Sequence, residues 1–215
     1  MYADEVPVIE AAMRYDAQTF ANGVMFAILS ARVPFGRTPE QCRDLAKYGE
    51  KSKTLWSWKL DAYKYLTEHR NTIWHAACAR PKTKAGAAEC IAVLCRIPGL
   101  GIVKAAFVAQ MIGHNVACID ARNIQRDGRN PREYRSDGQI GKARPAFARK
   151  IERYVHDTWG QAQHYWDVWC NEVGPDYGMT GAQCSKAHVD AIVPAPLHRT
   201  FKRVPATRAD NEVPF

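Results

Sequence analysis

The chain has 215 residues and a mass of 24.2 kDa, enough for one sizeable domain or for two lobes around a shared core. Its 30 Lys and Arg residues against 22 Asp and Glu give a formal charge of +8, which favours a polyanionic partner. A hydrophobic content of 47% argues against disorder, and no uncharged apolar run approaches the roughly 18 residues of a membrane span. We therefore expect a soluble protein with no membrane partner.

The N-terminus and the cysteines both predict a cytoplasmic protein. The opening Met-Tyr-Ala-Asp-Glu lacks the basic start and apolar stretch of a secretory signal. Seven cysteines, an odd number with no CxxC pair, suit reduced thiols better than a disulfide framework. Their spacing matches no four-ligand zinc or iron-sulfur pattern, so we expect neither a metal nor a cofactor.

Apolar residues in the first half of the chain recur at spacings of three and four, which is typical of helices and predicts an all-α fold. The first long helix contains Phe20 and Ala31 and is broken by Pro34 and Gly36. The pattern predicts further helices, in chain order, over residues 39–48, 54–69, 71–79 and 86–96.

The segment Ile97-Pro98-Gly99-Leu100-Gly101 interrupts two apolar helical patterns, and a helix resumes over residues 102–112 with Gly113 as its C-cap. Two helices joined by such a turn form a hairpin. Glycine lacks a Cβ and tolerates positive φ, so the turn backbone can approach a ligand closely. The second helix presents free N–H groups at its start, and this combination suits a phosphate.

Residues 122–153 carry ten Lys and Arg against four Asp and Glu, a surplus of six, with Gly and Pro residues that indicate an irregular loop. Beyond it, residues 147–169 predict one long helix or two, and residues 185–192 a short one. We expect a single domain over 1–195, with the hairpin at about 86–113, the basic loop at about 122–146, and a tail over 196–215.

The hairpin segment, followed after one helix by Cys118-Ile119-Asp120, resembles the helix-hairpin-helix (HhH-GPD) DNA glycosylase superfamily. The family pattern is L-P-G-(V/I)-G, a helix, and a short apolar run ending in an Asp that opens the next helix. Upstream, Phe26 to Ala31 is similar to the family's early core helix, which usually continues into Gln where this chain has Arg32. The resemblance covers roughly residues 18–170 and implies an all-α fold in two lobes.

In that family the hairpin grips the backbone of double-stranded DNA while the target base is flipped into a cleft between the lobes. The resemblance implies that Gly99 and Gly101 grip the phosphates and that Asp120 is the catalytic carboxylate. Asp120 would stabilise positive charge on the deoxyribose or activate the attacking nucleophile. A plainer interpretation makes Asp120 an N-cap and the glycines a tight turn, and both roles can coexist.

Departures from the family pattern predict a divergent branch. The Schiff-base lysine of bifunctional members is replaced by Val103, and we expect the adjacent Lys104, rotated by about 100° around the helix, to point away from that site. Lys104 would then contact phosphate or solvent, and no lyase chemistry follows. Val103 and Arg32 remain candidates for the cleft. The DNA-binding side chains that we expect, besides the hairpin glycines, are Lys104, Arg122, Arg126, Arg129, Arg132 and Arg135.

Three functions remain open from the sequence. The first is a monomeric, monofunctional DNA glycosylase in DNA repair, which cleaves an N-glycosidic bond and leaves an abasic site. The second follows a resemblance to compact bacteriophage relatives proposed to carry out thymine hypermodification. Such an enzyme would replace a pyrophosphate on 5-(hydroxymethyl)uracil in DNA with an amine or amino-acid co-substrate, in an infected bacterial host. The third is a catalytically silent DNA-binding protein in which Asp120 only caps its helix.

Overall fold

The computed structural model describes residues 1–134 and 145–201, which are helical and contain no strand. The all-α prediction is therefore confirmed for this part of the chain. The α-helices are α1 (Tyr2–Tyr15), α2 (Ala17–Leu29), α3 (Thr38–Tyr48), α4 (Ser57–Cys78), α5 (Lys84–Leu94), α6 (Ile102–Met111), α7 (Ala121–Arg126), α8 (Pro145–Thr158), α9 (Ala162–Val173), α10 (Gly181–Ile192) and α11 (Ala195–Phe201).

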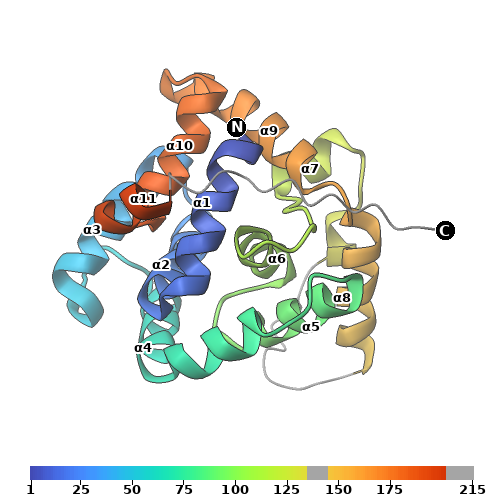
Figure 1. The fold of residues 1–215 in the computed structure, drawn as a ribbon, viewed down its shortest axis with the longest axis horizontal. Helices are drawn as coiled ribbons and strands as arrows, with labels where there is room; N and C mark the ends of the chain where they lie inside the picture. Colours follow the sequence, from blue (N-terminus) through green and yellow to red (C-terminus); the bar gives the residue numbers. More distant parts are fainter. Residues whose placement is uncertain (135–144, 202–215) are drawn as a thin grey trace.

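Helix α6 occupies the centre of the molecule, with α1, α2, α5 and α8 arranged around it (Figure 1). Apart from Val103 and Lys104, all of its residues are buried. Ala105, Ala106 and Ala109 are fully buried, and their small side chains let neighbouring helices approach closely. One hydrophobic cluster extends from α1 to the end of α10, so the termini of the described chain share a core with its centre.

Most predicted helices are present, although some of their bounds differ. Helix α1 was not predicted; its Ile9 and Met13 are fully buried and tie it to the core although Pro7 lies within it. Residues 54–69 and 71–79 form one helix, α4, because Ile73 and Ala77 continue the buried stripe of its first half. Helix α10 starts earlier than predicted, at Gly181. The range 147–169 divides into α8 and α9.

The structure describes the first residues of the expected tail, up to residue 201. They form α11, which packs against α1, where the rings of Tyr15 and Phe201 meet edge to face with centroids 5.7 Å apart. The remaining residues of the predicted tail, and residues 135–144 of the predicted basic loop, lie outside the described chain.

An extended segment, residues 114–120, joins α6 to α7 through the interior, where backbone polar groups need partners other than water. Three side chains supply them. The hydroxyl of Tyr154 donates to the Ala117 carbonyl (2.8 Å) and accepts from the N–H of Ile119 (2.9 Å). The other two contact Cys118: Gln110 accepts from its N–H (3.2 Å), and Asn123 donates to its carbonyl (3.2 Å). Asp120 is the last residue of this segment, so its backbone position is fixed.

Replacing Tyr154 by Phe should lower the free energy of unfolding by about 1–3 kcal/mol, because the buried N–H of Ile119 and carbonyl of Ala117 both lose their partner. Urea denaturation followed by circular dichroism measures the change. Tyr15→Phe is the matched control, since Tyr15 is 69% exposed and its change should stay within about 0.5 kcal/mol. Equal stability of the two variants would contradict a structural role for the Tyr154 hydroxyl.

Candidate functional site

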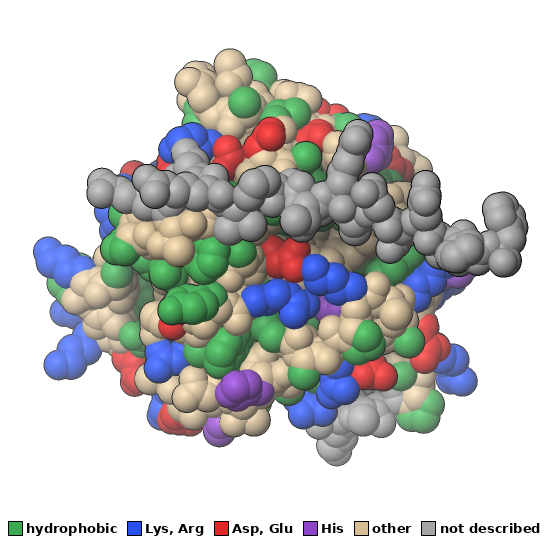
Figure 2. Space-filling model, viewed as in Figure 1, with side chains coloured by type: hydrophobic (Ala, Val, Ile, Leu, Met, Phe, Trp, Pro, Cys, Tyr) green, Lys and Arg blue, Asp and Glu red, His purple; other side chains and the backbone are tan. Residues whose placement is uncertain are grey.

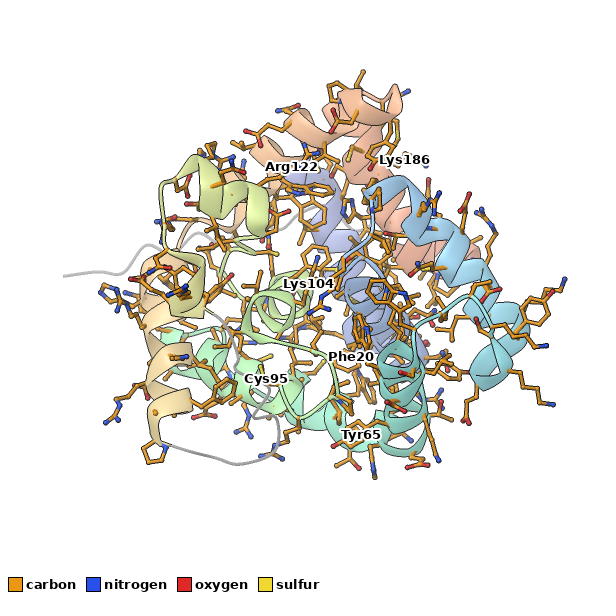
Figure 3. All side chains as sticks on the ribbon, turned by 180° about the vertical axis from the view of Figure 1, so that it is seen from behind. Phe20, Tyr65, Cys95, Lys104, Arg122 and Lys186 are labelled. Atoms are coloured by element: carbon orange, nitrogen blue, oxygen red, sulfur yellow. The ribbon has the colours of Figure 1, made fainter. Side chains whose placement is uncertain are left out.

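A cavity of about 310 Å³ lies between α2, α6, α9 and α10 and reaches the start of α7. Figure 3 labels two of its residues, Lys104 on α6 near the middle of the molecule and Arg122 on α7. A larger hollow of about 800 Å³ between α2, α3, α4 and α10 contains neither Asp120 nor a hairpin residue. The side chains that line the smaller cavity include Phe26, Ser30, Phe35, Lys104, Phe107, Gln110, Cys118, Asp120, Arg122, Tyr165, Trp166, Trp169, Tyr177 and His188.

The walls of this cavity are aromatic and surround His188. The His188 ring stacks on Phe35 with centroids 5.0 Å apart, and its centroid lies 4.8 Å from that of Trp166 and 5.5 Å from that of Trp169. The cavity of about 310 Å³ beside these rings suits a flat ligand that stacks or packs edge to face. The sequence gave no sign that α2, α6, α9 and α10 bring these rings together.

Asp120 is held in one orientation at the start of α7. Its Oδ1 accepts from the N–H of Asn123 (3.0 Å), and its Oδ2 accepts from Nε1 of Trp169 (2.7 Å). The N-cap interpretation is therefore confirmed. The side chain also lines the cavity and is only partly buried, so capping and a chemical role are compatible. The sequence did not predict the contact with Trp169, 49 residues further along the chain, because a tryptophan in an apolar helix is expected to pack in the core.

The expectation that Lys104 points away from the site is wrong. Its side chain lines the cavity that Asp120 lines, its Nζ donates to Oγ of Ser30 (3.0 Å), and it lies 5.7 Å from the centroid of the Phe107 ring. The rotation of about 100° relative to Val103 was right, but the cavity lies on the Lys104 side of α6. Val103 and Arg32, the two residues proposed for the cleft, do not line it. Arg32 is exposed, with a positive φ of 60°.

The hairpin has the predicted form, with α5 and α6 joined by Ile97 to Gly101. Gly99 has a φ of 76°, and a Cβ at this position would lie 2.6 Å from the ring of Trp58, so glycine is required on both counts. Gly101 is the N-cap of α6 with an ordinary φ of −81°. Within the described chain, the N–H groups of Gly99, Gly101 and Ile102 have no hydrogen-bond partner, as an anion-binding turn requires.

A buried lysine supports the hairpin from behind. Lys59 is 1% exposed, and its Nζ donates to the Leu29 carbonyl and to Oε1 of Gln41, both at 2.8 Å. The same Nζ lies 5.4 Å from the centroid of the Trp58 ring, which packs on Gly99. Burial, together with the charge of Lys104, lowers the pKa of Lys59 to about 8. The sequence did not indicate that Lys59 is buried, because a lysine in an amphipathic helix is normally expected to be exposed.

Several arginines of the basic segment form ion pairs within the part of the chain that the structure describes. Arg122 forms an ion pair with Asp176 (2.7 Å), and Arg126 forms one with Glu172 (3.1 Å). Arg129 lies 3.5 Å from Asp127 and contacts two tyrosine hydroxyls. These contacts neither test nor remove the predicted role in DNA binding, but they give each arginine a structural function as well. Arg132 is exposed, and Arg135 lies outside the described residues.

Among the residues that the structure describes, no three His, Cys, Asp or Glu side chains are grouped as a metal site, and no helix is long and apolar enough to cross a bilayer. Comparisons with protein-family models, curated proteins and solved structures found no match to this chain. The chemistry of the cavity must therefore be argued from its own residues.

The depressed pKa of Lys59 gives a test of the buried amine behind the hairpin. Between pH 8 and about 10.5 the unfolded chain holds this proton more tightly than the folded chain, so the Lys59 contribution to stability rises with pH. The free energy of unfolding of the native protein, minus that of Lys59→Met, should increase from pH 7.5 to pH 10. The same difference for Lys64→Met, an exposed site on α4, should stay flat. If the stability difference between the native protein and Lys59→Met did not change with pH, the amine of Lys59 would be solvated in the folded protein.

Proposed function

We propose that this protein is an enzyme that acts on a single base flipped out of duplex DNA into the aromatic cavity, with Asp120 as the catalytic carboxylate. The observation that carries the proposal is that one cavity joins an oriented carboxylate to a wall of aromatic rings, and that helix α6 contributes to both this cavity and the hairpin. The finer fold that we propose is the two-lobed HhH-GPD arrangement, with the base bound between the lobes.

The hairpin and the cavity suit successive parts of one nucleic acid. Gly99, Gly101 and Ile102 present N–H groups without partners at the N-terminus of α6, where the helix dipole favours a phosphate. Lys104, one turn along, reaches the cavity. A backbone phosphate held at the turn would thus place the neighbouring nucleotide next to the opening that Asp120 and Arg122 line.

The first reaction that we propose is hydrolysis of the N-glycosidic bond. Water oxygen bonds to C1′ of the deoxyribose, the bond from C1′ to the base nitrogen breaks, and the base leaves with the electron pair. Asp120 stabilises the positive charge that develops on the sugar and accepts the proton of the water. Because the N–H groups of Asn123 and Trp169 fix the carboxylate, no reorganisation is needed at that step.

A second reaction is favoured by one observation, the presence of two cations, Lys104 and Arg122, in the same cavity. A neutral base needs neither, whereas an anionic substituent on the base would be stabilised by both. In this reaction an amine nitrogen bonds to the methylene carbon of a pyrophosphorylated 5-(hydroxymethyl)uracil. The carbon–oxygen bond breaks, pyrophosphate leaves with the electron pair, and Asp120 accepts the proton that the amine loses.

Asp120→Asn should abolish the product of either reaction, lowering turnover by about 10²–10⁴-fold, because the amide cannot accept a proton or stabilise positive charge. Duplex oligonucleotides carrying uracil, alkylated bases or oxidised bases are incubated with protein, and abasic sites are measured by alkaline cleavage. Asp61→Asn, an exposed carboxylate on α4, is the matched control and should remain active. Tight DNA binding with no product from any substrate would leave the non-catalytic alternative.

Lys104→Met separates the two reactions. If the substrate carries a pyrophosphate, the variant should lose at least about tenfold in turnover, since a charge-assisted hydrogen bond to the leaving group disappears. The assay measures the gain in DNA mass when duplex containing pyrophosphorylated hydroxymethyluracil is supplied with an amine. Release of neutral bases should change far less in this variant. Lys64→Met controls for the loss of one positive charge, and an active Lys104→Met enzyme on the pyrophosphorylated duplex would exclude the second reaction.

A further inference from the structure

The imidazole of His188 on α10 is, with Gln110, one of the two polar groups of the cavity that are almost fully buried. The residue is 3% exposed, while Asp120 at the other side of the cavity is only partly buried and Arg122 is exposed. These exposures define a floor at His188 and a mouth at Asp120. Nδ1 of His188 lies 3.0 Å from the Cys184 carbonyl, an acceptor, so Nδ1 carries the proton. Nε2 is then an acceptor, and it has no partner among the described residues.

The imidazole stays neutral across the physiological range. Burial, reinforced by the nearby charge of Lys104, lowers the pKa of His188 to about 4. A second proton on Nε2 would therefore be lost to water at neutral pH, and the floor of the cavity presents a hydrogen-bond acceptor rather than a cation. Any ligand that reaches the floor must supply a donor there or leave a buried nitrogen unpaired.

The other polar side chains near the floor are occupied, with one exception. Gln110 donates to the Ala162 carbonyl (3.0 Å) and accepts from the N–H of Cys118. Ser30 donates to the Ala27 carbonyl (2.8 Å) and accepts from Lys104. Lys104 uses one of its three ammonium protons on Ser30, so it retains donors for a ligand. Nε2 of His188 is thus the neutral acceptor that a base can reach, and Lys104 keeps donors for an anionic substituent.

We propose, on the basis of the proposed function, that the cavity selects bases whose inward edge carries a ring N–H beside a carbonyl, the lactam edge of uracil, thymine and their derivatives. His188 accepts the ring N–H through Nε2, and the aromatic walls hold the ring plane. Cytosine presents a ring acceptor at this edge, which would face the lone pair of Nε2. His188 is therefore a specificity-determining residue for the base.

The test compares deoxyuridine with N3-methyldeoxyuridine at the centre of otherwise identical duplexes, with dissociation constants measured by fluorescence anisotropy. The methyl group removes the N–H and also prevents base pairing, which makes flipping easier. A cavity that ignores the N–H would bind the methylated duplex at least as tightly. We expect the native protein to bind the deoxyuridine duplex about ten to a hundred times more tightly. Equal binding, or tighter binding of the methylated duplex, would overturn the proposal.

Two variants test whether Nε2 of His188 causes the preference for deoxyuridine. His188→Phe keeps an aromatic ring in the cavity but removes the acceptor, so the preference for deoxyuridine should disappear. His164→Phe makes the same replacement at an exposed position on α9 and should retain it. A preference that survives in His188→Phe would show that another group reads the base, and the proposal would fail even if the enzyme acts on DNA.

A second arm needs no DNA and separates this inference from the proposed function. Tryptophan fluorescence is titrated with 1-methyluracil and with 1,3-dimethyluracil, since Trp166 and Trp169 line the cavity. Tighter binding of 1-methyluracil, lost in His188→Phe, would support the lactam selectivity even if the protein bound no duplex and the proposed function failed. Equal or absent binding of both compounds at millimolar concentration would overturn the selectivity itself.

Discussion

The structure depends on how the extended segment at residues 114–120 crosses the interior. Buried backbone groups outside a helix or sheet must find other hydrogen-bond partners, and Gln110, Tyr154 and Asn123 provide them from α6, α8 and α7. This arrangement fixes the end of the segment, so that Asp120 both caps α7 and meets Trp169 from α9. The orientation of the carboxylate thus follows from capping the backbone of α7 together with the hydrogen bond from Trp169.

The sequence predicted the features that depend on local physics. The apolar spacing of α3, α5 and α6, the break at Gly99 and the capping by Asp120 follow from propensities that act within a few residues. Helix α1 was not predicted. Pro7 disfavours a helix locally, whereas burial of the apolar face of α1 in the shared core stabilises the helix. Tertiary packing overrides this local penalty, and the helical spacing of Val6, Ile9 and Met13 along the chain agrees with it.

The candidate site shows the same contrast between features that local sequence determines and features that helix packing determines. Asp120 could be found from its place after a short apolar run, but Lys104 was assigned to the wrong side of α6. The angle between neighbouring residues on a helix is fixed, yet the direction of a cavity depends on which elements surround the helix. His188 and Trp169 come from α10 and α9, and their convergence on Asp120 and Lys104 is set by helix packing, to which sequence spacing is blind.

The distribution of charge now has a different meaning from the one that the sequence indicated. Arg122 and Arg126 meet Asp176 and Glu172 from later in the chain, so the local surplus of the basic segment is partly neutralised where it packs on α9. Figure 2 likewise shows acidic and basic side chains interspersed over one face. Exposed ion pairs contribute little stability, and phosphates can replace the carboxylates as partners. If the proposed duplex binds, Arg122 at the cavity mouth can exchange its carboxylate for a phosphate, whereas the N–H groups of Gly99 and Gly101 have no partner within the described residues to give up.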